Sequence, residues 1–184
     1  MACAGGVAGG VTWVVLVYRL PPKAAALKAA VHRRLRAAGA VYVSRACAVA
    51  PSTPWAERAM RRARTMITQA GGSATLLRGQ ALGGALDLTA AFNAARDREY
   101  GDIIVTCADA VADLTAATAA GDFRYERLWE RDTGLEQLSL RYRALCGQDL
   151  LGAGQAAAAG AALDSYRAAL DVYAKGVYAT DSAS

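Results

Sequence analysis

The chain has 184 residues and a formal net charge of +5, but that charge is unevenly distributed. Residues 1–85 carry 12 Lys or Arg and one acid, Glu57, for a net charge of +11, whereas residues 86–184 carry 9 basic and 15 acidic residues. The length fits one domain with an appended subdomain and is enough to bury a core without disulfides or metals. Such asymmetry indicates that one half faces a polyanion, or that the two halves neutralise each other.

The cysteines and the N-terminus exclude several classes of protein. Cys3, Cys47, Cys107 and Cys146 form no CxxC or Cys/His cluster, so we expect reduced, buried thiols rather than a zinc site or a disulfide framework. Residues 1–10 contain no Lys or Arg and are predicted to be a disordered tail rather than a signal peptide. The apolar run that follows is far shorter than the ~20 residues of a membrane helix. We therefore expect a cytoplasmic protein with no membrane partner.

Residues 11–85 are predicted to form a ferredoxin-like domain. "VTWVVLVY" at 11–18 is rich in β-branched and aromatic residues and is predicted as a strand buried on both faces. Pro21-Pro22 is expected to open a helix that Gly39 ends, with Leu27, Val31 and Leu35 facing inward.

"AVYVS" and "CAVAP" are predicted to form a hairpin around Arg45. Ser52-Thr53 followed by Pro54 is typical of a helix N-terminus, and Gly71-Gly72 of its end, before a last strand in "SATLLRG". The order is strand, helix, strand, strand, helix, strand, so the fold class is α+β: a βαββαβ domain with two helices on one face of an antiparallel sheet.

Residues 86–178 are predicted to form an α-helical C-terminal subdomain, followed by a tail at 179–184. A first helix runs from Asp87 to about Ala120, with Gly101 as a candidate break, and Gly152–Gly160 is interpreted as a linker. Apolar residues in the last two helices recur at spacings of three and four: Leu135, Leu138, Tyr142 and Leu145 in one, and Leu163, Tyr166, Leu170, Tyr173 and Val177 in the other. This seam needs a partner helix, either its neighbour in the chain or a second subunit.

No catalytic motif is visible. His32 is the only histidine, it stands among basic residues, and no GxSxG, P-loop, dinucleotide fingerprint or HExxH accompanies it. We therefore expect no enzyme, no catalytic residue, no metal site and no cofactor.

The basic residues are the strongest signal. Guanidinium groups on rigid helices bind phosphate bidentately, so these residues are interpreted as a nucleic-acid-binding face. The predicted set is Lys28, His32, Arg33, Arg34, Arg36, Arg45, Arg58, Arg61 and Arg62. The alternative is a merely solubilising surface.

Several motifs resemble the N-terminal domain of ChrB-type chromate resistance regulators, in order over about residues 12 to 178. They are "WVVLVYRLP", "RRLRAAGAVYV", "FNAARDREY", "GDFRYERL" and "LDSYRAALDVYAKGVYA". The resemblance implies a cytoplasmic bacterial protein that acts as a chromate-responsive transcriptional regulator. The first half is also similar to the ferredoxin-like module of PaaX-type repressors and of a CRISPR adaptation nuclease. Arg19 stands where that nuclease group has a metal-binding aspartate, so metal-dependent cleavage is not expected.

Three functional hypotheses follow. The first is a DNA-binding regulator, a homodimer that uses the basic face and has chromate or a similar oxyanion as effector. The second is a non-catalytic protein-interaction module. The third is a small-anion sensor in which Arg19, Arg96 and Tyr100 line a polar pocket; alternatively, Asp97 or Glu99 makes the cluster an internal ion pair.

Overall fold

The structure, a computed structural model, describes residues 11–81 and 87–181. The predicted disordered tail at 1–10 lies outside these residues. The chain divides into two compact units between Ala95 and Arg96. We call them the sheet unit (described residues 11–81 and 87–95) and the helical unit (described residues 96–181), and treat each by itself.

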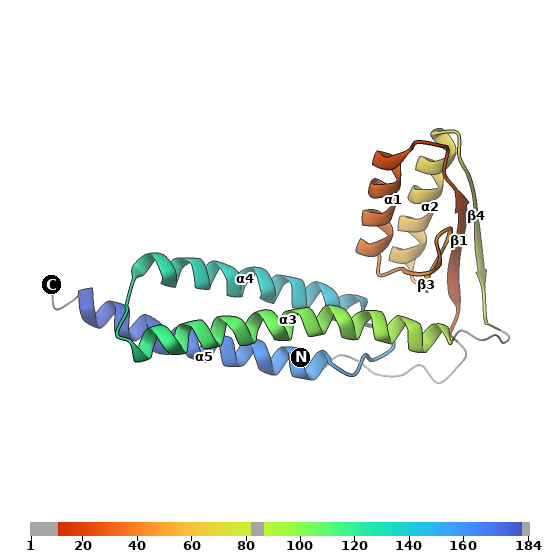
Figure 1. Ribbon diagram of the computed structural model, residues 1–184. Helices are drawn as coiled ribbons and strands as arrows, with labels where there is room; N and C mark the ends of the chain where they lie inside the picture. The colour runs from red at the N-terminus through yellow and green to blue at the C-terminus, as the bar shows by residue number, and fades with distance from the viewer. Residues whose placement is uncertain (1–10, 82–86, 182–184) are drawn as a thin grey trace. The chain divides into compact units, whose positions relative to one another are not determined.

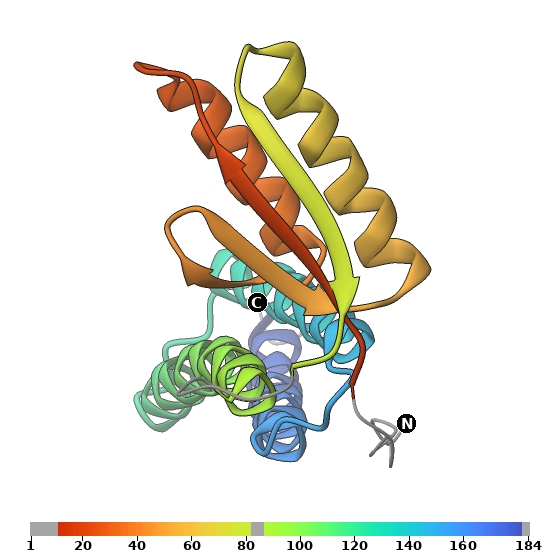
Figure 2. The ribbon, with the colours of Figure 1, turned by 90° about the vertical axis from the view of Figure 1, so that its right-hand side faces the viewer.

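The sheet unit has the predicted βαββαβ order (Figures 1 and 2). Its elements are β1 (Trp13–Arg19), α1 (Ala25–Ala37), β2 (Val41–Ser44), β3 (Cys47–Pro51), α2 (Pro54–Gln69) and β4 (Ser73–Gly79). The strands lie in the order β2-β3-β1-β4, and each neighbouring pair is antiparallel. Helices α1 and α2 cover one face of this sheet, which confirms the predicted α+β architecture.

The core of the sheet unit lies between the sheet and these two helices. Val14 and Leu16 of β1 belong to the same buried cluster as Leu35 of α1 and Met60 and Ile67 of α2. Alternate residues of a strand point to opposite faces, so the intervening residues of β1 point away from the helices.

The prediction that the first strand is buried on both faces is wrong. Val17 is 44% exposed and Val15 is half-buried, because both helices pack on the opposite face. Trp13 is buried on this side, where its ring packs edge-on against Phe92 with the ring centroids 6.2 Å apart.

The prediction that Pro21-Pro22 opens the first helix is also wrong. Pro22 lies in a turn, and α1 begins only at Ala25. Lys23 has a φ of 62°, a left-handed conformation that a right-handed helix cannot contain. The helix therefore starts only after this residue.

Both ends of α2 follow the sequence signals. The Oγ1 of Thr53 accepts a hydrogen bond from the amide N of Ala56 at 3.1 Å, and Pro54 is the first helical residue. At the other end, a Cβ on Gly72 would lie 2.6 Å from the carbonyl oxygen of Arg19 and 3.0 Å from that of Ile67. Glycine thus allows the chain to leave α2 close against the end of β1.

The helical unit is built from α3 (Leu88–Ala119), α4 (Tyr125–Gln148) and α5 (Ala156–Asp181), with the first residues of α3 in the sheet unit. The predicted seam of the last helix is confirmed: Leu163, Tyr166, Leu170, Tyr173 and Val177 are all buried. They share one core cluster with Leu135 and Leu145 of α4, so the partner of the seam is the neighbouring helix in the chain.

Of two interruptions predicted in the helical unit, one is absent and the other is shorter than expected. Helix α3 continues through Gly101, because a single glycine costs only about 1 kcal/mol while Tyr100 and Ile103 beside it are fully buried. The predicted linker is shorter than expected, since α5 begins at Ala156 and contains Gly160. Alanine favours helix, and burial of Ala159 adds packing that the composition did not reveal. At its other end α5 continues to Asp181, past the predicted start of the tail.

Candidate functional site

A groove with a volume of about 480 Å³ runs between α1 and α2 on the solvent side of the two helices. It is lined by Ala30, Arg33, Arg34 and Ala37 of α1 and by Trp55, Arg58, Ala59, Arg62 and Met66 of α2. On both helices the lining residues recur three and four positions apart, so each helix presents one continuous stripe. Three alanines keep the floor open between longer side chains.

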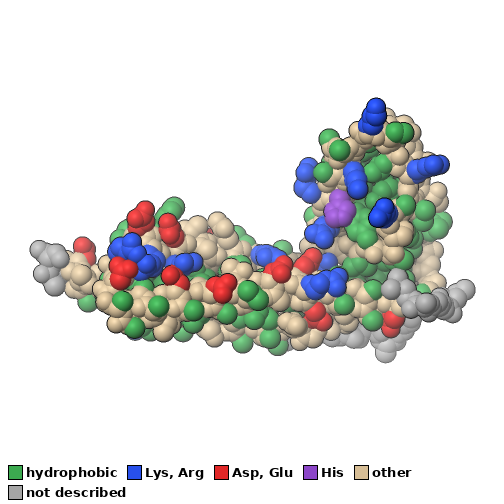
Figure 3. Space-filling model, in the orientation of Figure 1, with side chains coloured by type: hydrophobic (Ala, Val, Ile, Leu, Met, Phe, Trp, Pro, Cys, Tyr) green, Lys and Arg blue, Asp and Glu red, His purple; other side chains and the backbone are tan. Residues whose placement is uncertain are grey.

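The four arginines of the groove carry charge without local compensation. Arg33, Arg34, Arg58 and Arg62 are all exposed, and none forms an ion pair within residues 11–81 and 87–181. Figure 3 shows basic side chains, and no acidic ones, over the part of the surface that α1 forms. We refer to these four residues as the groove arginines.

Glu57, the single acid of residues 1–85, is occupied elsewhere. Its Oε1 accepts a hydrogen bond from the Oγ of Ser52 at 2.7 Å and forms an ion pair with Arg78 of β4, and its Oε2 lies 4.0 Å from Arg61. The hydrogen bond from Ser52, together with Arg78, lowers the pKa of Glu57 below its ordinary value. With Arg61, Arg64 and Arg78, Glu57 lines a separate hollow beside β4, so it does not neutralise the groove.

The other predicted basic residues lie outside the groove. The ring of His32 stacks on that of Tyr42, with centroids 4.6 Å apart and planes 15° apart, and Arg36 is near enough to act on the Tyr42 phenol. Burial of the phenol raises the pKa of Tyr42. Lys28 is exposed on α1, Arg45 lies in the β2–β3 turn, and Arg61 faces Glu57. The structure therefore gathers four of the nine predicted residues into one groove.

Sequence reasoning missed Trp55. Its side chain is 58% exposed in the first turn of α2, whereas Trp13 is buried. The available signal was its spacing, since Arg58 and Arg62 follow Trp55 by three and then four residues and so share its helix face.

Most of the second predicted cluster lies in the helical unit, where each of its residues has a polar partner of its own. Arg96 is only 2% exposed, and its Nη1 lies 3.1 Å from the Oε2 of Glu99 and donates a hydrogen bond to the Oε1 of Gln148 at 2.9 Å. The hydroxyl of Tyr100 donates a hydrogen bond to the Oδ2 of Asp149 at 3.3 Å.

Asp97 completes this set, since its Oδ1 accepts a hydrogen bond from the amide N of Gln155 at 2.8 Å. Arg96, Asp97 and Tyr100 thus hold the segment between α4 and α5 against α3. Arg19 belongs to the sheet unit, where it lines a shallow hollow with Pro21, Pro22 and Gly72.

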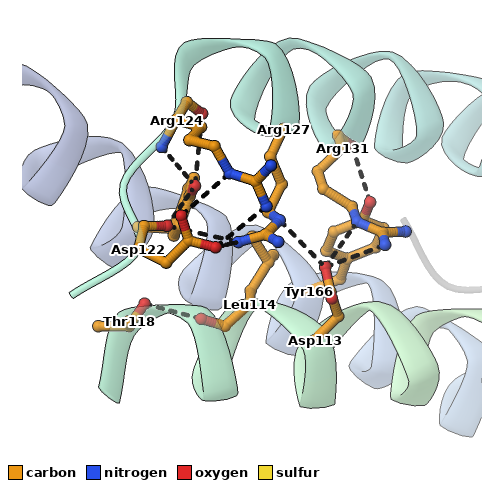
Figure 4. Close-up of polar contacts among 9 residues, drawn as sticks. Asp113, Leu114, Thr118, Asp122, Arg124, Arg127, Arg131 and Tyr166 are labelled. Carbon is orange, nitrogen blue, oxygen red and sulfur yellow. Dashed lines mark hydrogen bonds and ion pairs between the residues drawn. The ribbon is translucent and has the colours of Figure 1, made fainter. Parts of the chain in front are cut away.

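Charged residues at the α3–α4 corner are also paired (Figure 4). Arg127 lies 2.8 Å from the Oδ2 of Asp122, and Arg131 lies 2.9 Å from the Oδ2 of Asp113. Hydrogen bonds from Arg127 and then Arg124 lower the pKa of Asp122. The hydroxyl of Tyr173 donates to the carbonyl oxygen of Asp122 at 2.9 Å and accepts from the amide N of Arg124 at 2.8 Å, which ties α5 to this corner.

Among the residues that the structure describes, no group of three or more His, Cys, Asp or Glu side chains is arranged to hold a metal ion. Likewise, none of the described helices is both long and apolar enough to cross a membrane. Cys47, Cys107 and Cys146 are not in disulfides. Burial raises the pKa of the Cys107 and Cys47 thiols.

The family model described as Protein ChrB, N-terminal, matches residues 28–184. The chain therefore belongs to this family, which is associated with chromate resistance, and the resemblance seen in the sequence is confirmed. The match covers α1 from Lys28 onward and all of α2, and hence every residue that lines the groove. No curated protein matches the chain, and no solved structure does. The likeness to PaaX-type repressors and to the CRISPR nuclease stays a sequence-based interpretation.

Proposed function

We propose that the chain is a regulatory protein of chromate resistance that binds DNA through the groove between α1 and α2, with chromate or a similar oxyanion as effector. The observation that carries the proposal is the set of four groove arginines, which face solvent without an acidic partner in the described part of the chain. Family membership supports the link with chromate resistance.

The chemistry of the groove suits a phosphate backbone. Guanidinium groups bind phosphate oxygens bidentately, and helices that pack on a sheet hold their side chains at fixed spacings. Releasing counterions from DNA makes such binding fall steeply with salt. An arginine that is already paired with a carboxylate would have to break that ion pair before it could bind a phosphate. The groove arginines have no such ion pair to break within the described residues.

A charge-reversal experiment tests the DNA-binding role. The double variant Arg58→Glu, Arg62→Glu should weaken binding of a short random-sequence duplex by roughly 100-fold at fixed salt, because each reversal replaces attraction by repulsion worth at least ~1.4 kcal/mol. The matched control is Arg64→Glu, Arg98→Glu, which changes the net charge equally at two exposed positions outside the groove.

Equal losses in the two double variants would show that net charge alone matters and would overturn the groove as the binding site. Circular dichroism of both variants checks that each remains folded. Reversal that unfolds the protein only in the groove variant would mean that Arg58 and Arg62 are structural.

A second arm tests the effector. Chromate should lower the affinity of the protein for DNA, while sulfate, a tetrahedral dianion of similar charge, should not at equal ionic strength. If sulfate lowered the affinity for DNA as much as chromate does, the effect would be ordinary competition between anions for the basic side chains. That result would contradict a chromate-specific role.

One observation favours the alternative of a protein-interaction module. Tyr125 and Trp129 lie one helical turn apart on α4 and are 67% and 63% exposed. Aromatic residues are enriched at protein interfaces, so this pair is the surface on which such a partner would dock. Replacing both by serine should leave DNA binding unchanged if the groove is the DNA site. Homodimer formation, the absence of enzyme activity and a cytoplasmic location stay predictions.

A further inference from the structure

We propose that the groove between α1 and α2 receives one unpaired strand of nucleic acid, with backbone phosphates on the groove arginines and a base stacked on Trp55. This inference rests on the proposed nucleic-acid binding and adds to it the form of nucleic acid that fits. It leads to an order of affinities, single strand above duplex, that the charge of the groove alone does not give.

Trp55 is exposed to solvent beside the groove arginines. An indole side chain gains most from burial, yet Trp55 is 58% exposed at the rim of the groove and forms no ring contact with another aromatic residue among those described. An exposed ring face beside cations is the arrangement on which a nucleobase stacks.

The segment that carries Trp55 is held rigidly at the start of α2. Pro54 precedes it at the first helical position, where the ring fixes φ. The Thr53 hydroxyl caps the helix through the amide of Ala56, and the Ser52 hydroxyl bonds to Glu57. These contacts fix the first turn of α2, so little backbone entropy remains to be lost when a base binds.

Positive charge lines both walls of the groove beyond Trp55. Arg58 and Arg62 lie three and seven residues beyond Trp55, or about 4.5 and 10.5 Å along the axis of α2 at 1.5 Å per residue. Arg33 and Arg34 line the opposite wall on α1. A strand whose base stacks on Trp55 would therefore run between cations on both sides.

The space between two packed helices favours a single strand over a duplex. The axes of packed helices are typically 8–10 Å apart, so the furrow between two helices admits one backbone and not a whole duplex. In a duplex the base faces are already stacked, and exposing one costs a few kcal/mol. An unpaired strand meets neither obstacle, and each stacked base contributes about 1–3 kcal/mol.

The test uses the full chain and three fluorescently labelled probes at one salt concentration: a single strand, its duplex and an abasic single strand with the same number of phosphates. The wild type should bind the single strand most tightly. Trp55→Ala should lower that affinity by roughly 5- to 150-fold, while Trp55→Phe should restore part of it because phenylalanine keeps an aromatic face. Binding of the abasic strand should be weak and indifferent to either change.

Trp129→Ala is the matched control, since Trp129 is exposed to a similar degree but lies in the helical unit, and it should leave all three affinities unchanged. Duplex binding at least as tight as single-strand binding overturns the inference. So does a Trp55→Ala effect that is absent or equal for the three probes. If duplex binding is strong and responds only to Arg58→Glu, Arg62→Glu, the proposed function stands without this inference; if no probe binds, both are overturned.

Discussion

The two units of the chain use the same residue, arginine, in opposite ways. In the helical unit most arginines are paired with carboxylates, whereas the groove arginines of the sheet unit have no acidic partner in the described residues. The paired set comprises Arg96, Arg124, Arg127, Arg131, Arg141 and Arg167. The contrast separates arginines that hold a fold together from arginines available to a ligand.

The difference follows from where the acids lie in the sequence. Residues 1–85 contain one acid, and Ser52 and Arg78 already bind it, so no acid of this part of the sequence remains to pair with the groove arginines. Residues 86–184 contain 15 acids, and most of their arginines pair with a carboxylate of the helical unit. Changes at the groove arginines should therefore affect binding, and changes at the paired arginines should affect stability.

The largest expected effect on stability is at Arg96. Arg96→Met removes the ion pair with Glu99 and the hydrogen bond to Gln148 from a site that is 2% exposed, and should lower the free energy of unfolding by roughly 2–4 kcal/mol. Arg62→Met, in the groove, should change it by no more than about 0.5 kcal/mol. Urea unfolding followed by circular dichroism measures both, and equal losses would remove the distinction between the two sets.

The fold of the sheet unit was predictable because its signals are local. Thr53-Pro54 and Gly71-Gly72 mark the ends of α2, and the period-four stripe of Leu27, Val31 and Leu35 identifies the inner face of α1. The left-handed turn at Lys23 could not be predicted, because φ is positive there in a residue that rarely adopts it. The exposure of Val17 could not be predicted for another reason. A run of apolar residues does not indicate whether one face of the sheet or both faces are covered.

The second largest effect on stability is expected from packing at one end of the helical unit. A Cβ on Gly176 would lie 2.0 Å from the Cε1 of Phe123, so Phe123 fills the space that this glycine leaves on α5. Gly176→Ala should therefore cost roughly 1–3 kcal/mol of stability through overpacking. Gly147→Ala is the control, because no atom lies within 4 Å of its Cβ position and alanine favours helix. A stabilised Gly176→Ala variant would show that Phe123 can move aside at no cost.

The smallest effect on stability is expected at Asp122. Hydrogen bonds from Arg127 and Arg124 hold the pKa of Asp122 below its ordinary value of 3.8, so the folded state favours the ionised form. The resulting stabilisation is present above pH 3.8 and disappears as the pH falls through the lower folded value. Asp122→Asn should thus lower the melting temperature slightly at neutral pH, and the difference from the wild type should narrow in strong acid. If the difference in melting temperature were the same at both pH values, ionisation of Asp122 would not contribute to stability.

The site was only partly predictable. The sequence identified nine basic residues, but which of them share a groove depends on how far α1 and α2 rotate about their axes, and the inner stripes fix this only approximately. Arg61 is on the same helix as Arg58 and Arg62, yet it turns toward Glu57. Stacking of His32 on Tyr42 depends on the pairing of β2 with the rest of the sheet, which no single stretch of sequence contains.

The salt dependence of DNA binding tests the central claim most directly, that the groove arginines bind phosphates. For the wild type, log K should fall linearly with log salt, with a slope of about −0.9 for each phosphate neutralised. Replacing Arg33, Arg34, Arg58 and Arg62 together by alanine should reduce that slope by up to about 3.6, while the protein melts at an unchanged temperature. A slope that stays as steep in the fourfold variant would place the phosphate contacts elsewhere and contradict the account.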